Sequence, residues 1–300
     1  MNRLTTLFQP STTPLQILSD LHLDNENQYP TFHIPAAAPT LLLAGNIGRL
    51  IDYPLYLSFL ARRCTVHEKV FLVLGHLEFS GLEYTDALQL AHALEKEPAM
   101  RGRLEVLYRT RSEIVVSGAK VVVLGCSLWS RIPEGDESAV RRKCGEFAES
   151  GIGGAWSVER HNQEHERDVR WLKRQVEKAA RPPVGTDGKR VSGFQAQAHT
   201  HVVVVTAFAP DLRDALEPWQ VDAPWSSAYG TDLLSGDEWA GVRLWVCGTT
   251  GRTCEFKKGG TTVVSNQRGR EGEHVTGLLR DGLSEKQKVG LFDVMRVVRV

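Results

Sequence analysis

Short, unbroken runs of valine, isoleucine and leucine recur along this 300-residue chain, and longer polar-and-apolar stretches separate them. Runs of this kind are typical of strands buried on both faces, and the stretches between them have helical character. The pattern therefore predicts consecutive strand-and-helix units of one α/β sandwich. We expect strands at Leu15–Leu18, Thr40–Ala44, Val70–Leu74, Ile114–Val116, Lys120–Gly125, His201–Thr206, Val242–Val246 and Thr261–Val264, and helices at Tyr53–Cys64, Leu82–Glu97 and Ser157–Ala180.

Five short polar or glycine-containing segments stand out beside these runs, and four of them directly follow an apolar run. In an open α/β sheet, ligands bind beyond the carboxyl ends of the strands. The sequence therefore predicts that these segments meet at one site. They are Ser19-Asp20-Leu21-His22, Gly45-Asn46-Ile47-Gly48, Gly75-His76-Leu77-Glu78, Thr206-Ala207-Phe208-Ala209-Pro210 and Gly248-Thr249-Thr250-Gly251.

The charge balance and the cysteines narrow the class of protein. Lys+Arg and Asp+Glu are both 36, so the chain has no basic excess with which to bind nucleic acid. No apolar run approaches the roughly 20 residues that cross a bilayer, and the first ten residues lack a signal-peptide core. The five cysteines are scattered and show no close pairing. We therefore expect a reduced, cytoplasmic protein without nucleic-acid or membrane partners.

The segments resemble those of the calcineurin-like metallophosphoesterase superfamily, above all its small fungal-type branch. That branch is expected to read LQILSDLHL, LLLAGDIGRL, VFLVLGNHEF, VVVTHHAP and WVFGHTH, followed by VVSNQRG. This chain reads LQILSDLHL, LLLAGNIGRL, VFLVLGHLEF, VVVTAFAP and WVCGTTG, followed by VVSNQRG. The resemblance covers about residues 15–269 and implies a four-layer α/β/β/α sandwich. It implies one domain over 1–300, with 270–300 as a C-terminal extension.

The resemblance implies an intact first ligand loop. In the family, an Asp and a His two residues apart bind the first metal ion, and Asp20 and His22 match them. The carboxylate that bridges both metal ions is replaced by Asn46, which is neutral. The remaining metal-binding positions are changed as well.

In the third segment, His76 stands where the family has an asparagine ligand, and Leu77 stands where it has the histidine that protonates the leaving group. Ala207 replaces a histidine ligand of the second metal ion. Thr249 and Gly251 replace two further histidines. A two-metal phosphoesterase needs two cations about 3.5–4 Å apart, and a shared anionic ligand offsets their repulsion. We therefore expect that the dinuclear centre is lost.

The remaining chemistry is expected at Asp20, His22, Asn46 and His76, which we predict to be catalytic residues. An Asp beside an imidazole fixes its tautomer and raises its basicity, so acid/base catalysis is one interpretation. We expect no cofactor. The alternative is a single divalent zinc, manganese or iron ion bound by these same four residues, because carboxylate and imidazole suit such ions.

A small-molecule pocket is expected around these residues. Leu77, Ala207 and Phe208 make three polar positions apolar, which suits an organic ligand better than a hydrated phosphate. Glu78 is expected to brace its loop as well as to lie at the pocket. The other residues predicted to line the pocket are Thr249, Thr250, His161, Asn162 and His165.

Three functions fit these residues. The first is a repurposed enzyme that performs metal-independent acid/base chemistry on a small organic molecule, such as a biosynthetic step. The second is a non-catalytic pseudoenzyme that binds a ligand or partner. The third is a phosphoesterase that uses one metal ion. The sequence favours them in this order and specifies neither a substrate nor a protein partner.

Overall fold

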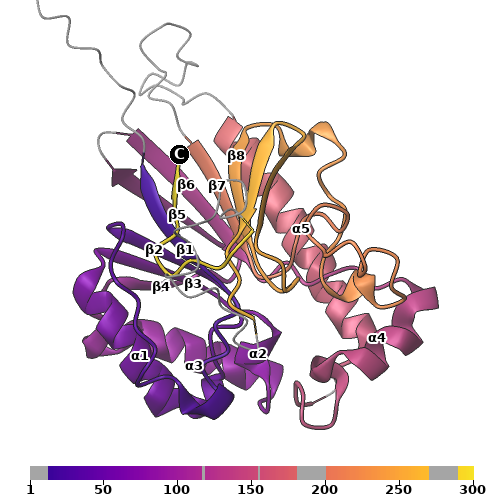
Figure 1. The fold of residues 1–300 in the computed structure, drawn as a ribbon, viewed down its shortest axis with the longest axis horizontal. Helices are drawn as coiled ribbons and strands as arrows, with labels where there is room; N and C mark the ends of the chain where they lie inside the picture. The colour runs from indigo at the N-terminus through magenta and orange to yellow at the C-terminus, as the bar shows by residue number, and fades with distance from the viewer. Residues whose placement is uncertain (1–12, 117–118, 155, 181–200, 270–289) are drawn as a thin grey trace, which may run out of the picture.

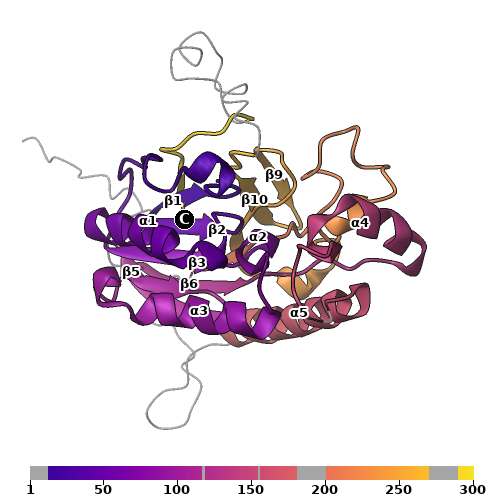
Figure 2. The ribbon, with the colours of Figure 1, turned by 90° about the horizontal axis from the view of Figure 1, so that it is seen from below.

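Two β-sheets packed face to face make the centre of the molecule, and helices cover their outer faces (Figures 1 and 2). The computed structural model describes residues 13–116, 119–154, 156–180, 201–269 and 290–300. The two sheets and the helices outside them confirm the predicted four-layer α/β/β/α sandwich. Most of the extension predicted at 270–300 lies outside the described residues.

The first sheet is parallel except at one edge. Its strand order is β11-β1-β2-β3-β4, and β11 is antiparallel to β1. The neighbouring runs of the sequence thus pair in chain order, whereas β11 brings residues 297–299 beside residues 14–16. The strands are β1 (Pro14–Leu18), β2 (Thr40–Ala44), β3 (Lys69–Val73), β4 (Leu104–Val106) and β11 (Val297–Arg299).

The second sheet has the order β5-β6-β7-β8-β10-β9, with a parallel centre and an antiparallel strand at each edge. The carboxyl ends of its parallel strands point to the same end of the molecule as those of β1, β2 and β3 (Figure 1). The strands are β5 (Thr110–Val116), β6 (Ala119–Cys126), β7 (His201–Thr206), β8 (Val242–Cys247), β9 (Cys254–Lys258) and β10 (Thr261–Ser265).

The helices lie on the two outer faces: α1 and α3 beside the first sheet, and α5 beside the second (Figures 1 and 2). The α-helices are α1 (Tyr53–Val66), α2 (His76–Phe79), α3 (Tyr84–Lys96), α4 (Glu137–Lys143) and α5 (Val158–Ala180). The 3₁₀ turns are η1 (Asn25–Asn27), η2 (Leu50–Asp52), η3 (Pro98–Met100), η4 (Glu134–Asp136), η5 (Gly145–Phe147), η6 (Ser226–Ala228) and η7 (Asp237–Trp239).

Side chains that point alternately to the two faces of the second sheet contribute to two hydrophobic cores. Val121 and Val123 of β6 face the first sheet, whereas Val122 and Leu124 pack against the apolar stripe of α5. Because successive side chains of a strand point to opposite faces, an unbroken valine run fills both cores at once. Each fully buried side chain of this size contributes about 1.5–3 kcal/mol. The apolar runs of the sequence therefore hold the layers together.

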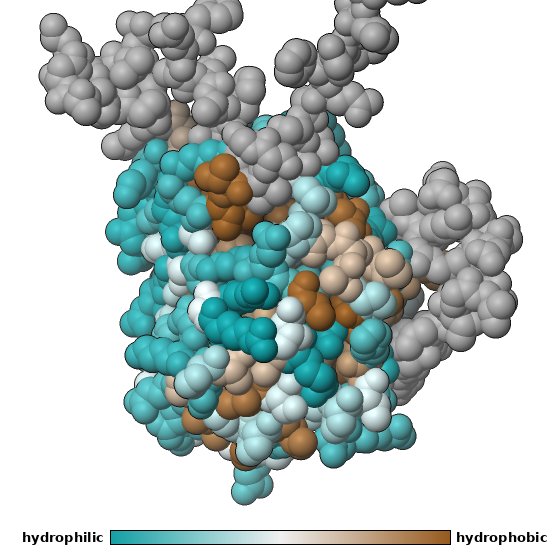
Figure 3. Space-filling model, turned by 90° about the vertical axis from the view of Figure 1, so that its left-hand side faces the viewer, coloured by the Kyte–Doolittle hydropathy of each residue, from teal (hydrophilic) through white to brown (hydrophobic). Residues whose placement is uncertain are grey.

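Each predicted strand and helix is present, with ends that differ by a few residues. Strands β4 and β9 and helices α2 and α4 were not predicted, and β11 falls in Leu291–Val300, where the sequence shows only a weak alternation of apolar and polar residues. Among the described residues, no helix is both long enough and apolar enough to span a membrane. On the face shown in Figure 3, hydrophilic residues dominate and the apolar residues form separate patches.

Candidate functional site

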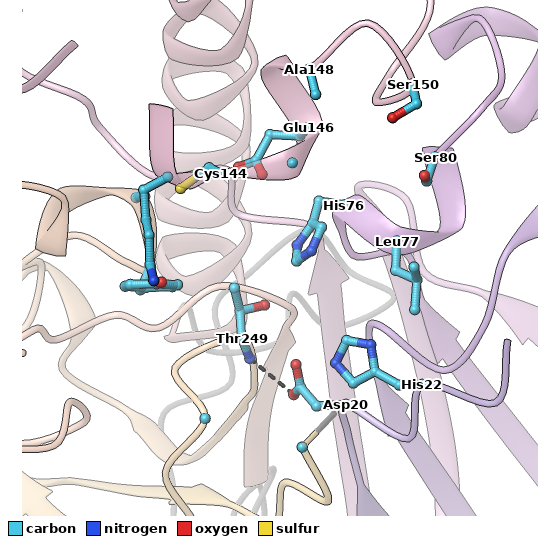
Figure 4. A pocket seen from close by; sticks show the side chains of 16 residues that line it. Asp20, His22, His76, Leu77, Ser80, Cys144, Glu146, Ala148, Ser150 and Thr249 are labelled. Carbon is cyan, nitrogen blue, oxygen red and sulfur yellow. Dashed lines mark hydrogen bonds between the residues drawn. The ribbon is translucent and has the colours of Figure 1, made fainter. Parts of the chain in front are cut away.

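A pocket of about 450 Å³ lies where the loops after the strands of both sheets meet (Figure 4). One wall comes from the predicted segments and the other from the chain after α4. Asp20, His22, His76, Leu77 and Thr249 are in the first wall. The other lining residues are Ser80, Lys143, Cys144, Gly145, Glu146, Ala148, Ser150, Ala228, Tyr229, Gly251 and Gly269.

A closed hydrogen-bond network holds the base of the first wall. The side-chain amide of Asn46 donates to Asp20 Oδ1 at 2.9 Å and to Thr249 Oγ1 at 3.1 Å, and its oxygen accepts from the backbone N–H of Leu77 at 3.1 Å. The backbone N–H of Thr249 donates to Asp20 Oδ2 at 3.0 Å. Asn46 therefore joins the first, third and fifth segments, and both oxygens of Asp20 accept hydrogen bonds from the protein.

Burial determines the electrostatics of Asp20. Its side chain is almost completely buried, which raises the pKa of the carboxyl above its usual value. The hydrogen bonds from Asn46 and Thr249 oppose this rise because they stabilise the charged form. Asp20 is thus a constrained, desolvated carboxyl and not a hydrated surface charge.

Glu78 braces the second and third segments from behind, as the sequence suggests. Its carboxylate accepts the backbone N–H groups of Asn46 at 3.0 Å, Ile47 at 2.8 Å and Gly75 at 2.8 Å, and the hydroxyl of Tyr56 at 3.1 Å. Burial raises the pKa of Glu78 to about 7 despite these donors. It is fully buried and is not among the lining residues of the pocket.

The loop backbones adopt sparsely populated conformations. Asp20, His22, Asn46 and Thr249 have φ angles of 52°, 47°, 55° and 69°, in the left-handed region that non-glycine residues rarely adopt. Such residues gather at functional sites, where the surrounding structure holds them in place. Here the hydrogen bonds of Asn46 and Glu78 provide that restraint.

His76 begins α2 and points into the pocket between the two walls (Figure 4). Among the described residues, none lies within hydrogen-bonding distance of its Nδ1, although this atom is buried. Its ring also lies near that of Phe208, with centroids 6.3 Å apart. Leu77, the next residue, lines the pocket beside His22 with an apolar side chain.

Three residues of the fourth and fifth segments lie beneath the pocket instead of lining it. Ala207 is fully buried, and a Cβ built on Gly45 would lie only 2.6 Å from its methyl carbon. Phe208 is buried between the rings of Trp129 and His161. Thr250 accepts a hydrogen bond from the Gln267 amide at 2.8 Å. Only Thr249 of these segments' predicted residues reaches the pocket.

The three α5 residues predicted for the pocket contact the loop after β6 instead of lining the pocket. His161 is fully buried, contacts Ser130 Oγ through Nε2 at 3.0 Å, and has its pKa lowered to about 3 by desolvation. Asn162 exchanges two hydrogen bonds of 2.9 Å with the backbone of Ile132. His165 contacts the carbonyl of Trp129, and burial lowers its pKa. None of the three is among the lining residues.

The far wall was missed because no motif marks it. It consists of the end of α4, the turn η5 and the loop to Ser150, together with Ala228 and Tyr229. Cys144 and Glu146 from this wall lie on one side of His76, and Asp20, His22 and Thr249 lie on the other (Figure 4). Burial raises the pKa of Tyr229 to about 12 and that of Cys144 above its usual value, so both stay protonated near neutral pH.

A search for groups of three or more His, Cys, Asp or Glu side chains that could hold a metal ion found none within the described residues. Comparison with known proteins gave no matching family model and no matching curated protein.

Solved structures do resemble this chain. The phosphopantetheinyl hydrolase of Mycobacterium tuberculosis aligns with a TM-score of 0.60 and 17% identity, over 86% of this chain and 90% of that one. GAP50 of Plasmodium aligns with a TM-score of 0.45 and 13% identity, over 89% and 74%. A dimetal phosphatase of Danio rerio aligns at 0.40 and 13%, over 85% and 87%. The first likeness confirms the predicted fold, and placement in the fungal-type branch stays a prediction.

Proposed function

We propose that this chain, which has the calcineurin-like metallophosphoesterase fold, is a divergent relative that has lost the dinuclear metal centre. In this proposal its pocket binds a small organic molecule, and His22 and His76 perform acid/base chemistry on it without metal ions. Asp20 and Asn46 position the loops around them.

The hydrogen bonding of Asn46 carries this proposal. The family resemblance assigns its position to a carboxylate shared by two cations, which must present oxygen to both. Here the NH₂ group faces Asp20 and Thr249, and the oxygen accepts from the backbone of Leu77. An amide N–H cannot bind a cation, and it donates to the carboxylate that would otherwise bind one. These residues do not fit a two-metal centre.

His76 and His22 supply the remaining reactive groups. Imidazole is the commonest general acid or base because its proton exchanges near neutral pH. Both rings line the pocket, and Nδ1 of His76 has no hydrogen-bond partner among the described residues. A bound molecule with a donor or acceptor beside His76 would therefore complete its hydrogen bonding.

A purely binding role is the second candidate, and one observation favours it. Both oxygens of Asp20 accept hydrogen bonds from Asn46 and Thr249, so this carboxyl is not free to exchange protons with a ligand. The chain would then keep the pocket without catalysis. Conversion of a ligand, as distinct from its binding, separates the two roles.

The first experiment measures metal content and phosphoesterase activity. We expect purified protein to hold far less than one metal ion per chain, and to leave p-nitrophenyl phosphate intact with or without added manganese. Stoichiometric metal together with turnover would overturn the loss of the metal centre and would support the single-metal alternative.

The second experiment looks for conversion. Protein is incubated with a small-molecule extract of the cells that express it, and products are followed by mass spectrometry. His22→Ala and His76→Ala are expected to abolish any conversion, whereas His33→Ala and His92→Ala, which change exposed histidines, are expected to leave it intact. A compound that is bound but unchanged by the native protein would favour the binding role.

A further inference from the structure

The side chain of Glu146, in the far wall of the pocket, has no hydrogen-bond or ion-pair partner in the part of the chain that the structure describes. Glu146 is only 6% exposed, yet it lines the pocket, and its carboxylate lies near His76 (Figure 4). Among the described residues, none forms a hydrogen bond or ion pair with this carboxylate. Its oxygens are not among the fully buried atoms that lack a partner, so they are open to the pocket, where a ligand with a matching donor would reach them.

Backbone hydrogen bonds hold the turn that carries Glu146 in place. The carbonyl of Glu146 accepts the N–H of Ile152 at 3.1 Å, and the carbonyl of Gly151 accepts the N–H of Gly81 at 2.7 Å. A Cβ on Gly151 would lie 2.6 Å from the carbonyl oxygen of Glu146, so the loop closes only around a glycine. Since Gly81 follows α2, the two walls are joined, and Glu146 keeps its place relative to His76.

The other groups of the far wall leave the charge of Glu146 uncompensated. Lys143, the one cationic residue among the lining residues, is exposed and places its ammonium group 5.3 Å from the centre of the Trp225 ring. Cys144 and Tyr229 are close enough to Glu146 for its charge to raise the pKa of both groups. They therefore add polarity but no positive charge.

We propose that Glu146 is the residue that selects the ligand of this pocket, and that the ligand carries a protonated amine held between Glu146 and the ring of Tyr229. This inference rests on the proposed function and names its substrate class. A carboxylate forms its strongest hydrogen bonds with cationic donors, and an aromatic ring adds attraction for an ammonium group. A phosphate in the same place would be repelled by the carboxylate of Glu146.

A matched set of small probes tests the inference. Phenethylamine, 2-phenylethanol and 2-phenylethyl phosphate share the same phenylethyl body and differ in the group that would meet Glu146. Binding to the full chain is followed by saturation-transfer NMR and titration. We expect the native protein to bind phenethylamine, and to bind the alcohol and the phosphate at least about tenfold more weakly.

The variant Glu146→Gln keeps the size of the side chain and removes its charge. It is expected to weaken phenethylamine binding about tenfold or more while leaving the alcohol unchanged. Glu149→Gln, an exposed residue of the same loop, is the matched control and should bind like the native protein. Circular dichroism and thermal melting show that both variants are folded.

Three results would overturn the inference: no phenethylamine binding by the native protein, equal binding by Glu146→Gln, or tighter binding of the alcohol or the phosphate. These results are distinct from failure of the proposed function, which would appear as bound metal and turnover of p-nitrophenyl phosphate. A metal-free, inactive protein that binds no amine contradicts only the role of Glu146.

Discussion

Two glutamates are buried near the candidate site, and they differ in what surrounds their carboxylates. Glu78 accepts hydrogen bonds from three backbone N–H groups at 3.0 Å or less and from Tyr56 at 3.1 Å. Glu146 has no such donor among the residues that the structure describes. Burial alone thus does not identify a functional carboxylate. The difference in partners separates a residue that holds loops together from one that is open to a ligand.

The largest effect is expected from removing the braced carboxylate. Glu78→Ala leaves several buried backbone N–H groups without an acceptor, and each costs about 1–3 kcal/mol. We expect the free energy of unfolding to fall by about 4 kcal/mol, measured by urea denaturation. Glu68→Ala, at an exposed site, is the control and should change it by less than about 0.5 kcal/mol. A loss at Glu78 as small as the control's would remove the contrast between the two glutamates.

A second carboxylate beside Asp20 should have the next largest effect. Asn46→Asp replaces the donor that lies 2.9 Å from Asp20 Oδ1 with a like charge. In chelator-treated protein we expect a loss of about 2–3 kcal/mol in the free energy of unfolding.

Added manganese should restore part of this loss in Asn46→Asp and leave the melting temperature of the native protein unchanged, because only the variant presents two carboxylates to a cation. Thermal melting with and without manganese measures this. Equal stability of the native protein and the metal-free variant would show that the Asn46 network holds the loops only weakly.

Removing the charge of Glu146 is expected to raise the free energy of unfolding, in contrast to the loss expected at Glu78. Glu146→Gln removes a buried charge without removing an interaction, so the free energy of unfolding should rise by about 1 kcal/mol. Urea denaturation of the ligand-free protein measures it. A decrease of that size would mean that a donor already satisfies Glu146 in the free protein.

The smallest change in stability at neutral pH is expected from His161, which is buried, in contrast to His76, which lines the pocket. His161 is fully buried and has its pKa lowered to about 3, whereas His76 lines the pocket. Between pH 6.5 and about 3 the unfolded chain binds a proton at position 161 that the folded chain does not, so this residue makes stability fall as pH falls.

Above pH 6.5 the contribution of His161 is fully present. Between pH 6.5 and about 3, we therefore expect the His161→Gln variant to take up about one proton less on unfolding than the native protein. The pH dependence of the unfolding free energy measures this difference. Identical slopes for the variant and the native protein would show that His161 does not stay neutral in the fold.

The fold could be predicted because most of its strands are short, unbroken runs of apolar residues. The valines of His201–Thr206 fill two cores, so their hydrophobicity is unbroken and their strand is evident. Cys254–Lys258 is an edge strand with alternating polar residues, and Leu104–Val106 has only three residues, so neither carried a strong signal. Tertiary pairing, which sequence periodicity does not record, decides both.

The site was only half predictable for a similar reason. The first wall follows strands and carries a family pattern, so Asp20, Asn46 and His76 could be named in advance. Glu146 lies in a short turn whose neighbours have no motif, and its importance arises from burial and missing partners. His161 and His165 match a metal-binding spacing on a helix, but packing against Trp129 places both behind the wall.

The first strand and the Asp20 loop that follows it depend on contacts with residues far along the chain. Asn266 donates to the carbonyl of Ile17 and accepts from the N–H of Ser19 at 3.0 Å. Residues 297–299 pair with the edge of β1 that faces away from β2. The start of the Asp20 loop is therefore anchored by a residue 249 positions further along the chain, and contacts of such long sequence separation form slowly. During translation, the Asp20 loop therefore cannot reach its final shape until residue 266 has been synthesised.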